Sequence, residues 1–484
     1  MRRIFLVIGA AVCTALLSLA PLPSAGATVV LTQLSNDPYT NSSSMHQTEV
    51  EPDIFSFGPT VVTAFQVGRF SSGGSSNIGW ATSADGGRTW TNGFLPGITI
   101  FAGGSYDRVS DPAVAYDAAH HVWLISSLPL TSSVGAGILV NRSTNGGTTW
   151  GTPVTVAAKA GVDKDWVVCD NGTTSPYRGH CYTEWDDNGA GNVIYMSTST
   201  DGGVSWSVPV TTTNRATGLG GQPVVQANGT VVVPIDNANE GAVLSFVSTN
   251  GGLSWSAPVT VATITDHSVA GSLRSGPLVS AQIDGAGKVY VAWHDCRFET
   301  SCQANDIVLS TSTNGLNWTA VTRVPIDPIG SGVDHFLPGI GVDRTTSGST
   351  THLALTYYYY PVSGCSVSTC QLDVGFVSSA DGGATWTARK QLAGPMQLQW
   401  LPNTTEGYMV GDYIATAYAK GKPRTSFAVA QAPNPTSVFQ EAMYSPSGNL
   451  VPHQATGPAV SVSESAVVGG VSDHALVARA LTSQ

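Results

Sequence analysis

The stretch Ser83-Ala84-Asp85-Gly86-Gly87-Arg88-Thr89-Trp90 decides the fold of this 484-residue chain, because it returns five more times in related form. The copies occupy residues 143–150, 199–206, 248–255, 312–318 and 379–386, and the copy at 312–318 is one glycine short. We refer to these five copies and the first segment, at residues 83–90, as the six boxes. Their closing tryptophans lie 60, 56, 49, 63 and 68 residues apart. The chain is therefore built from a repeated unit of roughly 59 residues.

Each box has the composition of a tight turn between two strands. Its Asp or Asn can fold back onto the backbone of the turn, and the glycines permit the positive φ angles found there. Short β-prone runs flank the boxes, as at residues 192–197 and 153–156, and two more runs precede each hairpin, as at 276–283 and 288–294. Four strands per unit, without helical periodicity, predict an all-β protein. The architecture that fits is a β-propeller of four-stranded antiparallel blades.

The number of blades follows from the length of chain left after the last box. Six units end at Trp386, and 98 residues follow. Residues 411–417 and 425–431 resemble an inner strand pair, residues 438–444 a third strand, and residues 29–33 the missing fourth strand. We therefore predict seven blades in a ring closed by pairing of the N- and C-terminal strands, which removes exposed sheet edges. Six blades and a strand-rich C-terminal tail are the alternative.

Composition and motifs restrict the class of partner. Lys and Arg number 21 against 32 Asp and Glu, a formal net charge of −11, which argues against nucleic acid or an anionic membrane. Only 11% of residues are charged, whereas 12 Trp, 15 Tyr and 13 Phe are present, so the chain can bury a large core. No Walker loop, paired zinc-ligand spacing or Gly-x-Ser-x-Gly element occurs. We expect a monomer without a cofactor.

The N-terminus and the cysteines both predict export. Arg2 and Arg3 precede an apolar run that ends near Leu19, and Ala25-Gly26-Ala27 follows. This pattern predicts a signal peptide over residues 1–27, cleaved after Ala27, and a single secreted domain over residues 28–484 without a membrane span. The six remaining cysteines fall in close pairs, so we expect three local disulfides, with free buried thiols as the alternative. The pairs are Cys169 with Cys181, Cys296 with Cys302, and Cys365 with Cys370.

The boxes are similar to the Asp-box, or bacterial neuraminidase repeat, and the chain resembles the sialidase superfamily over nearly its whole mature length. This resemblance implies an arginine triad that clamps a substrate carboxylate, an Asp acid/base, and a Tyr nucleophile assisted by Glu. The Arg-Ile-Pro element of the family is missing before the first box, where Glu49-Val50-Glu51-Pro52-Asp53-Ile54 stands instead. A sialidase-like enzyme whose substrate is a sugar other than sialic acid is therefore an alternative.

Blade geometry indicates where a site would form. The box turns lie on one face of a propeller, so the starts of first strands and the ends of second strands converge around the opposite mouth of the channel. These positions are unusually ionic for a charge-poor chain. First-strand starts carry Glu51, Asp53, Arg108, Asp111, Asp163, Lys164, Asp165, Arg274, Asp334, His335, Glu406 and Asp412. Second-strand ends carry Arg69, Glu184, Asp186, Asp187, Asp236, His294, Asp295, Arg297 and the run Tyr357 to Tyr360.

The resemblance assigns roles to part of this set. An arginine fork binds a carboxylate bidentately, so we expect one group of residues to bind the substrate: Arg69, Arg108, Arg274, Arg297, Asp53, Asp165 and His294. Carboxyl groups with separated pKa values can divide the acid and base roles. The candidate catalytic residues are Asp295, Glu184 or Asp111 as acid/base, Tyr358 or a neighbour as nucleophile, and His335. The predicted function is a secreted sialidase-like glycoside hydrolase that removes a terminal acidic sugar from an extracellular glycan.

Structural roles compete with each of these assignments. Asp53, Asp111 and Asp412 can tie inner strands to neighbouring amides. Arg297 can brace its disulfide loop by pairing with Asp295. His335 can be a buried structural histidine. The rival functions are a non-catalytic carbohydrate- or protein-binding propeller and a polysaccharide lyase with His335 or a tyrosine as base. We expect no metal site, with a structural calcium ion on oxygen ligands as the alternative. Its candidate ligands are Asp163, Asp165, Asp186 and Asp187.

Overall fold

The computed structural model describes residues 29–450, and the predicted signal peptide therefore lies outside the described residues. Within 29–450 the chain forms five four-stranded antiparallel sheets, one nine-stranded antiparallel sheet and one two-stranded hairpin. These sheets confirm the predicted all-β class and its four-stranded antiparallel units. The helices in this range are single 3₁₀ turns, and none is long and apolar enough to cross a bilayer.

The nine-stranded sheet contains two consecutive sets of strands joined only by the pair Ser75 and Val109. The first set is β2 (Glu49–Phe57), β3 (Thr60–Arg69), β4 (Ser75–Ser83) and β5 (Thr91–Phe94). The second set is β6 (Arg108–Asp117), β7 (Val122–Thr131), β8 (Val134–Gly135), β9 (Gly137–Ser143) and β10 (Val154–Ala158).

Four sheets follow in chain order, each a simple meander of consecutive strands. The first two contain β11 (Val162–Cys169), β12 (Cys181–Asp187), β13 (Val193–Ser199) and β14 (Val210–Thr211), then β15 (Val224–Val225), β16 (Val231–Asp236), β17 (Ala242–Ser248) and β18 (Val259–Thr263). The next two contain β19 (Ser280–Ile283), β20 (Val289–Asp295), β21 (Asp306–Ser312) and β22 (Thr322–Arg323), then β23 (Asp334–Val342), β24 (Leu353–Tyr360), β25 (Gln371–Ser379) and β26 (Lys390–Gln397).

The remaining four-stranded sheet joins the two ends of the described chain. It contains β29 (Ala415–Ala419), β30 (Lys422–Ala430), β31 (Glu441–Pro446) and β1 (Leu31–Gln33). β1 pairs antiparallel with β31, so that Leu31 lies opposite Pro446. The hairpin is β27 (Asn403–Thr404) with β28 (Gly407–Tyr408). The 3₁₀ turns are η1 (Ile100–Ala102), η2 (Asn188–Ala190), η3 (Ala270–Ser272), η4 (Thr300–Cys302), η5 (Gly348–Thr350) and η6 (Leu398–Trp400).

The six boxes connect the third and fourth strands of their sheets, and their side chains build the turn. In the first box, Ser83 Oγ accepts a hydrogen bond from the Gly87 amide at 2.8 Å and donates one to Asp85 Oδ1 at 2.8 Å. Asp85 Oδ1 also accepts the amides of Arg88 and Thr89 at 2.9 and 3.0 Å. The turn therefore satisfies its own backbone donors, which explains why this pattern recurs.

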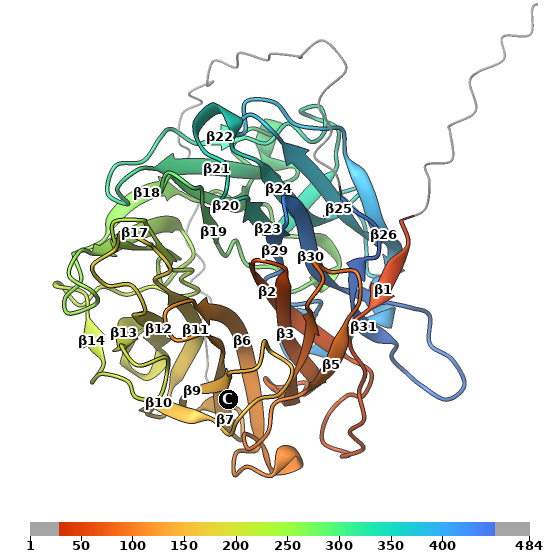
Figure 1. The fold of residues 1–484 in the computed structure, drawn as a ribbon. Helices are drawn as coiled ribbons and strands as arrows, with labels where there is room; N and C mark the ends of the chain where they lie inside the picture. Colours follow the sequence, from red (N-terminus) through yellow and green to blue (C-terminus); the bar gives the residue numbers. More distant parts are fainter. Residues whose placement is uncertain (1–28, 451–484) are drawn as a thin grey trace, which may run out of the picture.

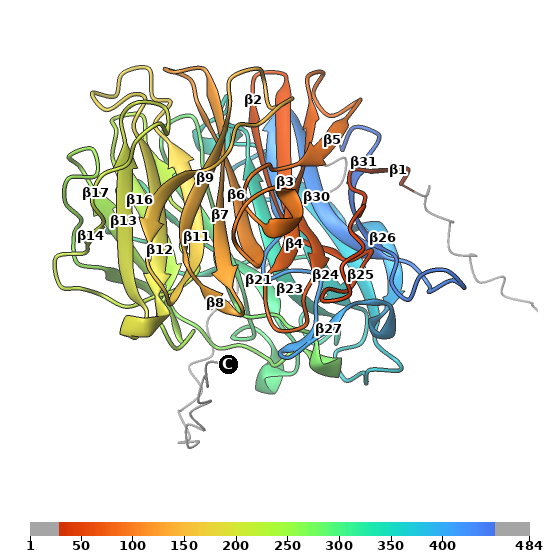
Figure 2. The same cartoon turned by 90° about the horizontal axis from the view of Figure 1, so that it is seen from below.

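The sheets are arranged about a common centre. In Figure 1, β2, β6, β11, β19, β23 and β29 lie around the middle of the molecule, and β10, β14, β22 and β26 lie toward the rim. Figure 2 shows the strands running between two faces at which the loops gather. The core fills the space between neighbouring sheets, as where Val224 and Val232 of the β15–β18 sheet pack with Val291 and Val308 of the β19–β22 sheet. The labelled inner strands thus lie at the centre of the molecule, and the sheets extend from them toward the rim.

The three local disulfides predicted from cysteine spacing are present. The S–S distances are 2.09 Å for Cys169–Cys181, 2.01 Å for Cys296–Cys302 and 2.06 Å for Cys365–Cys370. They close sequence separations of 12, 6 and 5 residues. Such short loops hold individual turns and strand ends, since the entropic gain of a cross-link grows with loop length.

Candidate functional site

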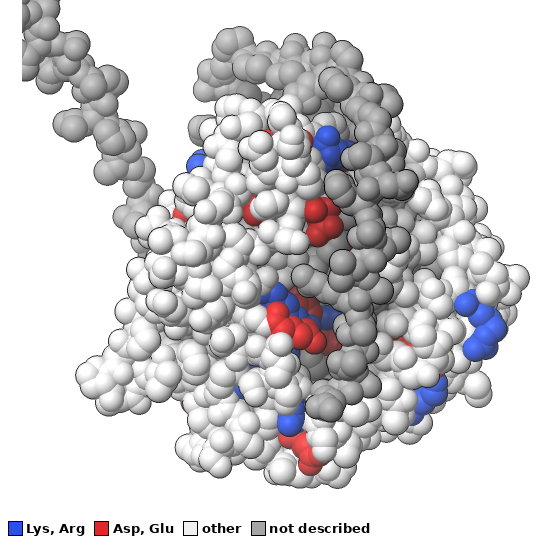
Figure 3. All heavy atoms as spheres, turned by 180° about the vertical axis from the view of Figure 1, so that it is seen from behind, with Lys and Arg blue, Asp and Glu red and all other residues white. Residues whose placement is uncertain are grey.

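An ionic cluster joins residues that are far apart in the sequence. Arg274 donates to both carboxylate oxygens of Asp412, at 2.6 and 2.5 Å, and its third nitrogen lies 2.6 Å from Glu406 Oε2. The Lys164 ammonium binds the same carboxylate of Asp412. Seen from behind the view of Figure 1, acidic and basic side chains lie side by side near the middle of the molecule (Figure 3). Asp412 is therefore the common partner of two cations.

A second set of hydrogen bonds ties Arg69 into this cluster. Arg69 Nη1 donates to Gln66 Oε1 at 2.7 Å, and Gln66 Nε2 donates to Glu51 and, at 3.0 Å, to Ser110 Oγ. The Asp412 amide in turn donates to Glu51 Oε1 at 3.2 Å. Two of the four predicted arginines, Arg69 and Arg274, therefore share one polar network. We call this network the ionic cluster; its charged members are Glu51, Arg69, Asp111, Asp163, Lys164, Arg274, Glu406 and Asp412.

Local backbone geometry sets the direction of three of these side chains. Glu51, Asp111 and Lys164 have φ angles of 55°, 48° and 53°, a region that residues other than glycine rarely occupy. Each lies within a register shift near the start of its inner strand, β2, β6 or β11. A β-bulge redirects a side chain that would otherwise alternate across the strand. Such conformations cost about 1–3 kcal/mol each, and they recur at functional sites.

Burial and charge separate the pKa values of the carboxyl groups in the cluster. Burial, together with the charges of Asp412 and Asp111, raises the pKa of Glu51 to about 8. Burial also opposes ionisation of Asp412, but Arg274 and Lys164 outweigh it and hold the pKa of Asp412 well below its usual range. At neutral pH the structure therefore pairs a protonated Glu51 with an ionised Asp412. Separated values of this kind are typical of acid/base sites.

Asp163 is the carboxyl group of this set that is both perturbed and accessible. Its side chain is half-buried, and burial together with the charge of Asp111 raises its pKa to about 6, against the opposing effect of Lys164. Asp163 Oδ1 accepts the Lys164 amide at 3.0 Å. A carboxyl group that titrates near neutral pH can both donate and accept a proton.

Buried acids extend from the cluster along β11 and β12. Burial raises the pKa values of Asp165 and Glu184 well above the usual range, and that of Asp186 also rises under burial and the charge of Asp163. All three side chains are at most 2% exposed. The predicted residues Asp111, Asp165 and Glu184 thus lie in or beside the cluster. Their burial lowers the local dielectric constant beside the cluster. The members of the cluster that contact solvent are Asp163, Lys164, Arg274 and Glu406.

The other two predicted arginines lie elsewhere. Arg108 Nη1 donates to Ser72 Oγ at 2.9 Å and to the Gly73 carbonyl at 3.0 Å, and the guanidinium stacks on Phe70 at 4.3 Å. Arg297 binds both oxygens of Asp295, at 2.9 and 2.6 Å. The structure does not bring these arginines into the cluster, because other groups already bind them: Ser72 and Gly73 bind Arg108, and Asp295 binds Arg297. Asp295, a predicted catalytic residue, also lies outside the cluster, because Arg297 binds both of its carboxylate oxygens.

Tyr358 and His335 lie in the packing between sheets. The Tyr358 hydroxyl donates to the Ala428 carbonyl at 2.9 Å and accepts the Ala428 amide at 3.0 Å. His335 is 1% exposed, and its ring nitrogens lie 3.0 Å from Asp327 Oδ2 and 3.2 Å from the Asn305 carbonyl. Both side chains have their polar atoms engaged away from the cluster. We therefore assign neither a catalytic role.

Asp53 and His294 are also buried outside the cluster. Asp53 Oδ2 accepts the Val114 amide of the next inner strand at 2.7 Å, and burial raises the pKa of Asp53 to about 7. His294 is fully buried, and burial lowers its pKa to about 4. Asp53 thus ties β2 to β6. Among residues 29–450, no group of three or more His, Cys, Asp or Glu side chains is placed to hold a metal ion.

The sequence places Glu51 and Lys164 at first-strand starts without indicating a role for them, and it indicates only a structural role for Asp412. It does not single out Gln66 or Tyr413. The Tyr413 ring packs edge-on against Trp166, with centroids 5.1 Å apart, inside the same region. One signal was available for the acidic members. Glu51 and Asp111 are each followed by proline, and proline inside a strand marks a bulge or an edge.

Comparison with known proteins identifies the repeat. The family described as a BNR repeat-like domain matches residues 131–338. Over these residues the chain is similar to BNR repeat-like domains, which bears out the predicted resemblance to the BNR-repeat superfamily. The matched segment includes Asp163, Lys164 and Arg274 of the cluster. A search of curated proteins finds no match.

Solved structures with a similar arrangement have low sequence identity. An ulvan lyase of polysaccharide lyase family PL25 is 10% identical, with 86% of this chain and 95% of that chain covered and a TM-score of 0.49. The NanB sialidase of Streptococcus pneumoniae is 13% identical, with 85% and 69% covered and a TM-score of 0.43. A Dyadobacter fermentans protein of unknown function is 16% identical, with 73% and 100% covered and a TM-score of 0.46.

Proposed function

We propose that this protein is a secreted glycoside hydrolase that acts on an extracellular glycan and binds a terminal acidic sugar over the ionic cluster. One observation carries the proposal. Asp163, a half-buried carboxyl group with its pKa raised to about 6, lies beside the cations Lys164 and Arg274. Glycoside hydrolysis needs a carboxyl group that can change protonation state near the working pH. The three disulfides support an extracellular location.

An anionic sugar can enter the cluster by exchange of carboxylates. Glu406, which pairs with Arg274 Nη1, has a side chain 58% exposed, whereas that of Asp412 is 6% exposed. The pair between Arg274 and Glu406 is therefore held weakly against solvent, and a substrate carboxylate can replace Glu406. The buried Asp412 stays in place and keeps Arg274 and Lys164 oriented.

Other residues of the ionic cluster have separate roles in proton transfer and in positioning the cations. Asp163 acts as the proton donor and acceptor at the glycosidic bond. Two carboxyl groups position the cations from the interior side of the cluster: Glu51, which is protonated at neutral pH, and the ionised Asp412. Both are almost fully buried. Arg69 supports the same arrangement through Gln66. We propose no nucleophilic tyrosine.

We further propose that the sheets form a seven-bladed ring of which the site occupies one mouth. Seven sets of four strands support this number when the nine-stranded sheet is divided at its single bridging pair and its short β8 is set aside. The pairing of β1 with β31 supports closure between the chain ends. A ring of this kind brings Glu51 of β2 next to Asp412, which lies three residues before the start of β29.

Activity assays test the proposal. The full chain is screened against fluorogenic sialosides, uronides and neutral glycosides. We expect turnover of an acidic glycoside, a loss of about 100-fold or more in kcat for Asp163→Asn, and a raised KM for Arg274→Met. Arg108→Met is the matched control, because Arg108 also begins a first strand but lies outside the cluster. Unchanged kinetics in both cluster variants would remove the site assignment.

Two other results would replace the proposed activity. Cleavage that leaves a new carbon–carbon double bond in the product would identify a lyase. Glycan binding without turnover of any substrate, weakened by Arg274→Met, would identify a non-catalytic carbohydrate-binding protein. The full ion pairing of Arg274 and Lys164 is the observation that favours this second candidate.

A further inference from the structure

A small cavity lies at the centre of the molecule, where the inner strands of different sheets meet. Its lining comes from β2, β6, β11, β19, β23 and β29 and from the segment that leads into β15. The cavity volume is about 30 Å³, room for about two water molecules. None of the charged members of the ionic cluster lines it. Its polar lining residues are Asp53, Trp166, Gln222, Ser280, Gln282 and Arg344.

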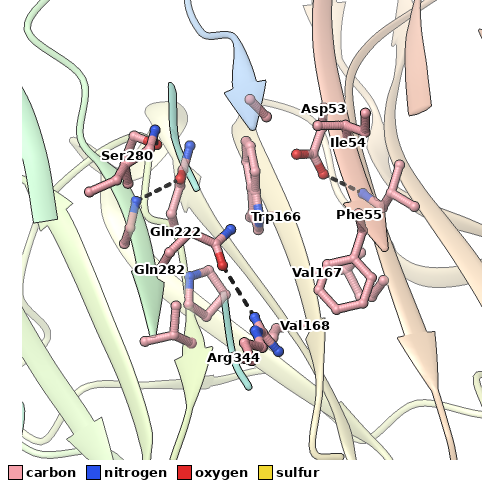
Figure 4. Close-up of a pocket in the computed structure, with 17 residues that line it drawn as sticks. Asp53, Ile54, Phe55, Trp166, Val167, Val168, Gln222, Ser280, Gln282 and Arg344 are labelled. Carbon is pink, nitrogen blue, oxygen red and sulfur yellow. Dashed lines mark hydrogen bonds between the residues drawn. The ribbon is translucent and has the colours of Figure 1, made fainter. Parts of the chain in front are cut away.

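The hydrogen-bond acceptors of this cavity are largely used by the protein itself. Asp53 Oδ2 accepts the Val114 amide at 2.7 Å, and Gln222 Oε1 accepts the Ala281 amide at 3.0 Å. Gln282 Oε1 accepts from Arg344 Nη2 at 3.3 Å. Figure 4 shows these contacts around the cavity. The oxygen atoms are thus turned toward protein donors.

Several hydrogen-bond donors that line the cavity have no protein acceptor in the described part of the chain. Within residues 29–450, the indole N–H of Trp166 and the side-chain amide NH₂ groups of Gln222 and Gln282 donate to no protein acceptor, although all three side chains line the cavity. Figure 4 shows Trp166, Gln282 and Arg344 on the same cavity. A small space with unused N–H donors and occupied acceptors is complementary to an anion.

Arg344 adds an uncompensated positive charge. It follows the end of β23, at the opposite end of the inner strands from the ionic cluster. Its guanidinium stacks over Phe55 at 5.1 Å and forms no ion pair within the described part of the chain. Burial lowers the pKa of Arg344 to about 10, and no neighbouring carboxylate offsets that effect. Arg344 is half-buried, and a cation partly removed from water is stabilised by an opposite charge.

We propose that the central cavity is a binding site for a monovalent anion of halide size, held by Arg344 together with the Gln282 amide and the Trp166 indole N–H. The cavity volume selects for one small ion over sulfate, phosphate or a sugar carboxylate. The bound anion neutralises Arg344 and links β11, β19 and β23 across the centre. This site is separate from the ionic cluster and does not depend on the proposed activity.

Unfolding of the full chain in different sodium salts tests the site. Chloride and bromide are compared with gluconate at pH 6 and equal ionic strength, because gluconate is too large for the cavity. A ligand that binds only the folded state multiplies the folded-to-unfolded ratio by 1 + [L]/Kd. We expect the melting temperature to rise and saturate with chloride and bromide but not with gluconate.

Substitutions assign the effect to the cavity. Arg344→Met removes the charge and should abolish the halide response, whereas Arg215→Met, at an exposed arginine outside the cavity, should retain it. Gln282→Glu supplies an internal carboxylate next to Arg344, and it should stabilise the chain in gluconate and remove the halide response. This second variant keeps the test decisive if Arg344→Met does not fold.

Crystals of the unsubstituted protein soaked in bromide locate the ion. An anomalous peak in the cavity beside Arg344 is expected. The proposal is overturned if halides leave the melting temperature unchanged, if the response persists in Arg344→Met or Gln282→Glu, or if bromide is found only on the outer surface.

Discussion

Asp53 provides a direct link between burial and pH-dependent stability. Its carboxyl group is 5% exposed, and burial raises its pKa from 3.8 to about 7 even though the Val114 and Ile54 amides oppose that rise. The unfolded chain therefore ionises this group at a lower pH than the folded chain. The contribution of Asp53 to stability falls as the pH rises from about 4 to about 7, and it stays low above that.

The size of the effect follows from the shift. About three pKa units at 1.36 kcal/mol each amount to about 4 kcal/mol in total. Between pH 5 and pH 8 the loss amounts to about 2–3 kcal/mol. Asp53→Asn removes the titration and keeps one oxygen for the Val114 amide. It gives up the second amide contact at a cost of about 1 kcal/mol, which is equal at both pH values and cancels in the comparison.

Urea unfolding at pH 5 and pH 8 measures this difference. Asp53→Asn should raise the free energy of unfolding at pH 8, relative to pH 5, by about 2–3 kcal/mol more than the parent chain shows. Asp85→Asn is the matched control. Hydrogen bonds from the Thr89 amide and neighbouring donors hold the pKa of Asp85 well below its usual range, so its substitution should have the same effect at both pH values. An equal effect of Asp53→Asn at pH 5 and pH 8 would refute the linkage.

Three further substitutions test packing and local structure. Tyr358→Phe removes two hydrogen bonds to the β30 backbone; it should lower the free energy of unfolding by about 2 kcal/mol and leave kcat unchanged, and a large fall in kcat of the folded variant would return Tyr358 to the site. Ser143→Ala removes the acceptor of a turn amide in the second box; calorimetry should show a loss of about 1–2 kcal/mol, and no loss would contradict a structural role for the box serine. Replacing Cys296 and Cys302 together by serine opens a loop of sequence separation 6; denaturant unfolding should show a loss of about 2 kcal/mol, and complete failure to fold would mean that the disulfide does more than close a short loop.

Much of the fold is readable from the sequence, because its signals are local. The boxes carry the Ser, Asp or Asn and Gly residues that complete a turn within about five positions, and their spacing gives the repeat length. The cysteine pairs are local for the same reason. The strand predicted at 411–417 begins only at Ala415, because Asp412 is held by Arg274 and Lys164, and no local signal reports those contacts.

The sequence by itself determined the all-β class, the repeated four-stranded unit, the disulfides and a face rich in ionic groups. Only the tertiary structure decided which of those groups meet. Arg297 pairs with Asp295, two positions away, whereas Arg274 pairs with Asp412, 138 positions away. The physical reason is that side-chain direction near the centre depends on bulges at Glu51, Asp111 and Lys164 and on the packing of separate sheets. Those are properties of the folded assembly rather than of any one strand.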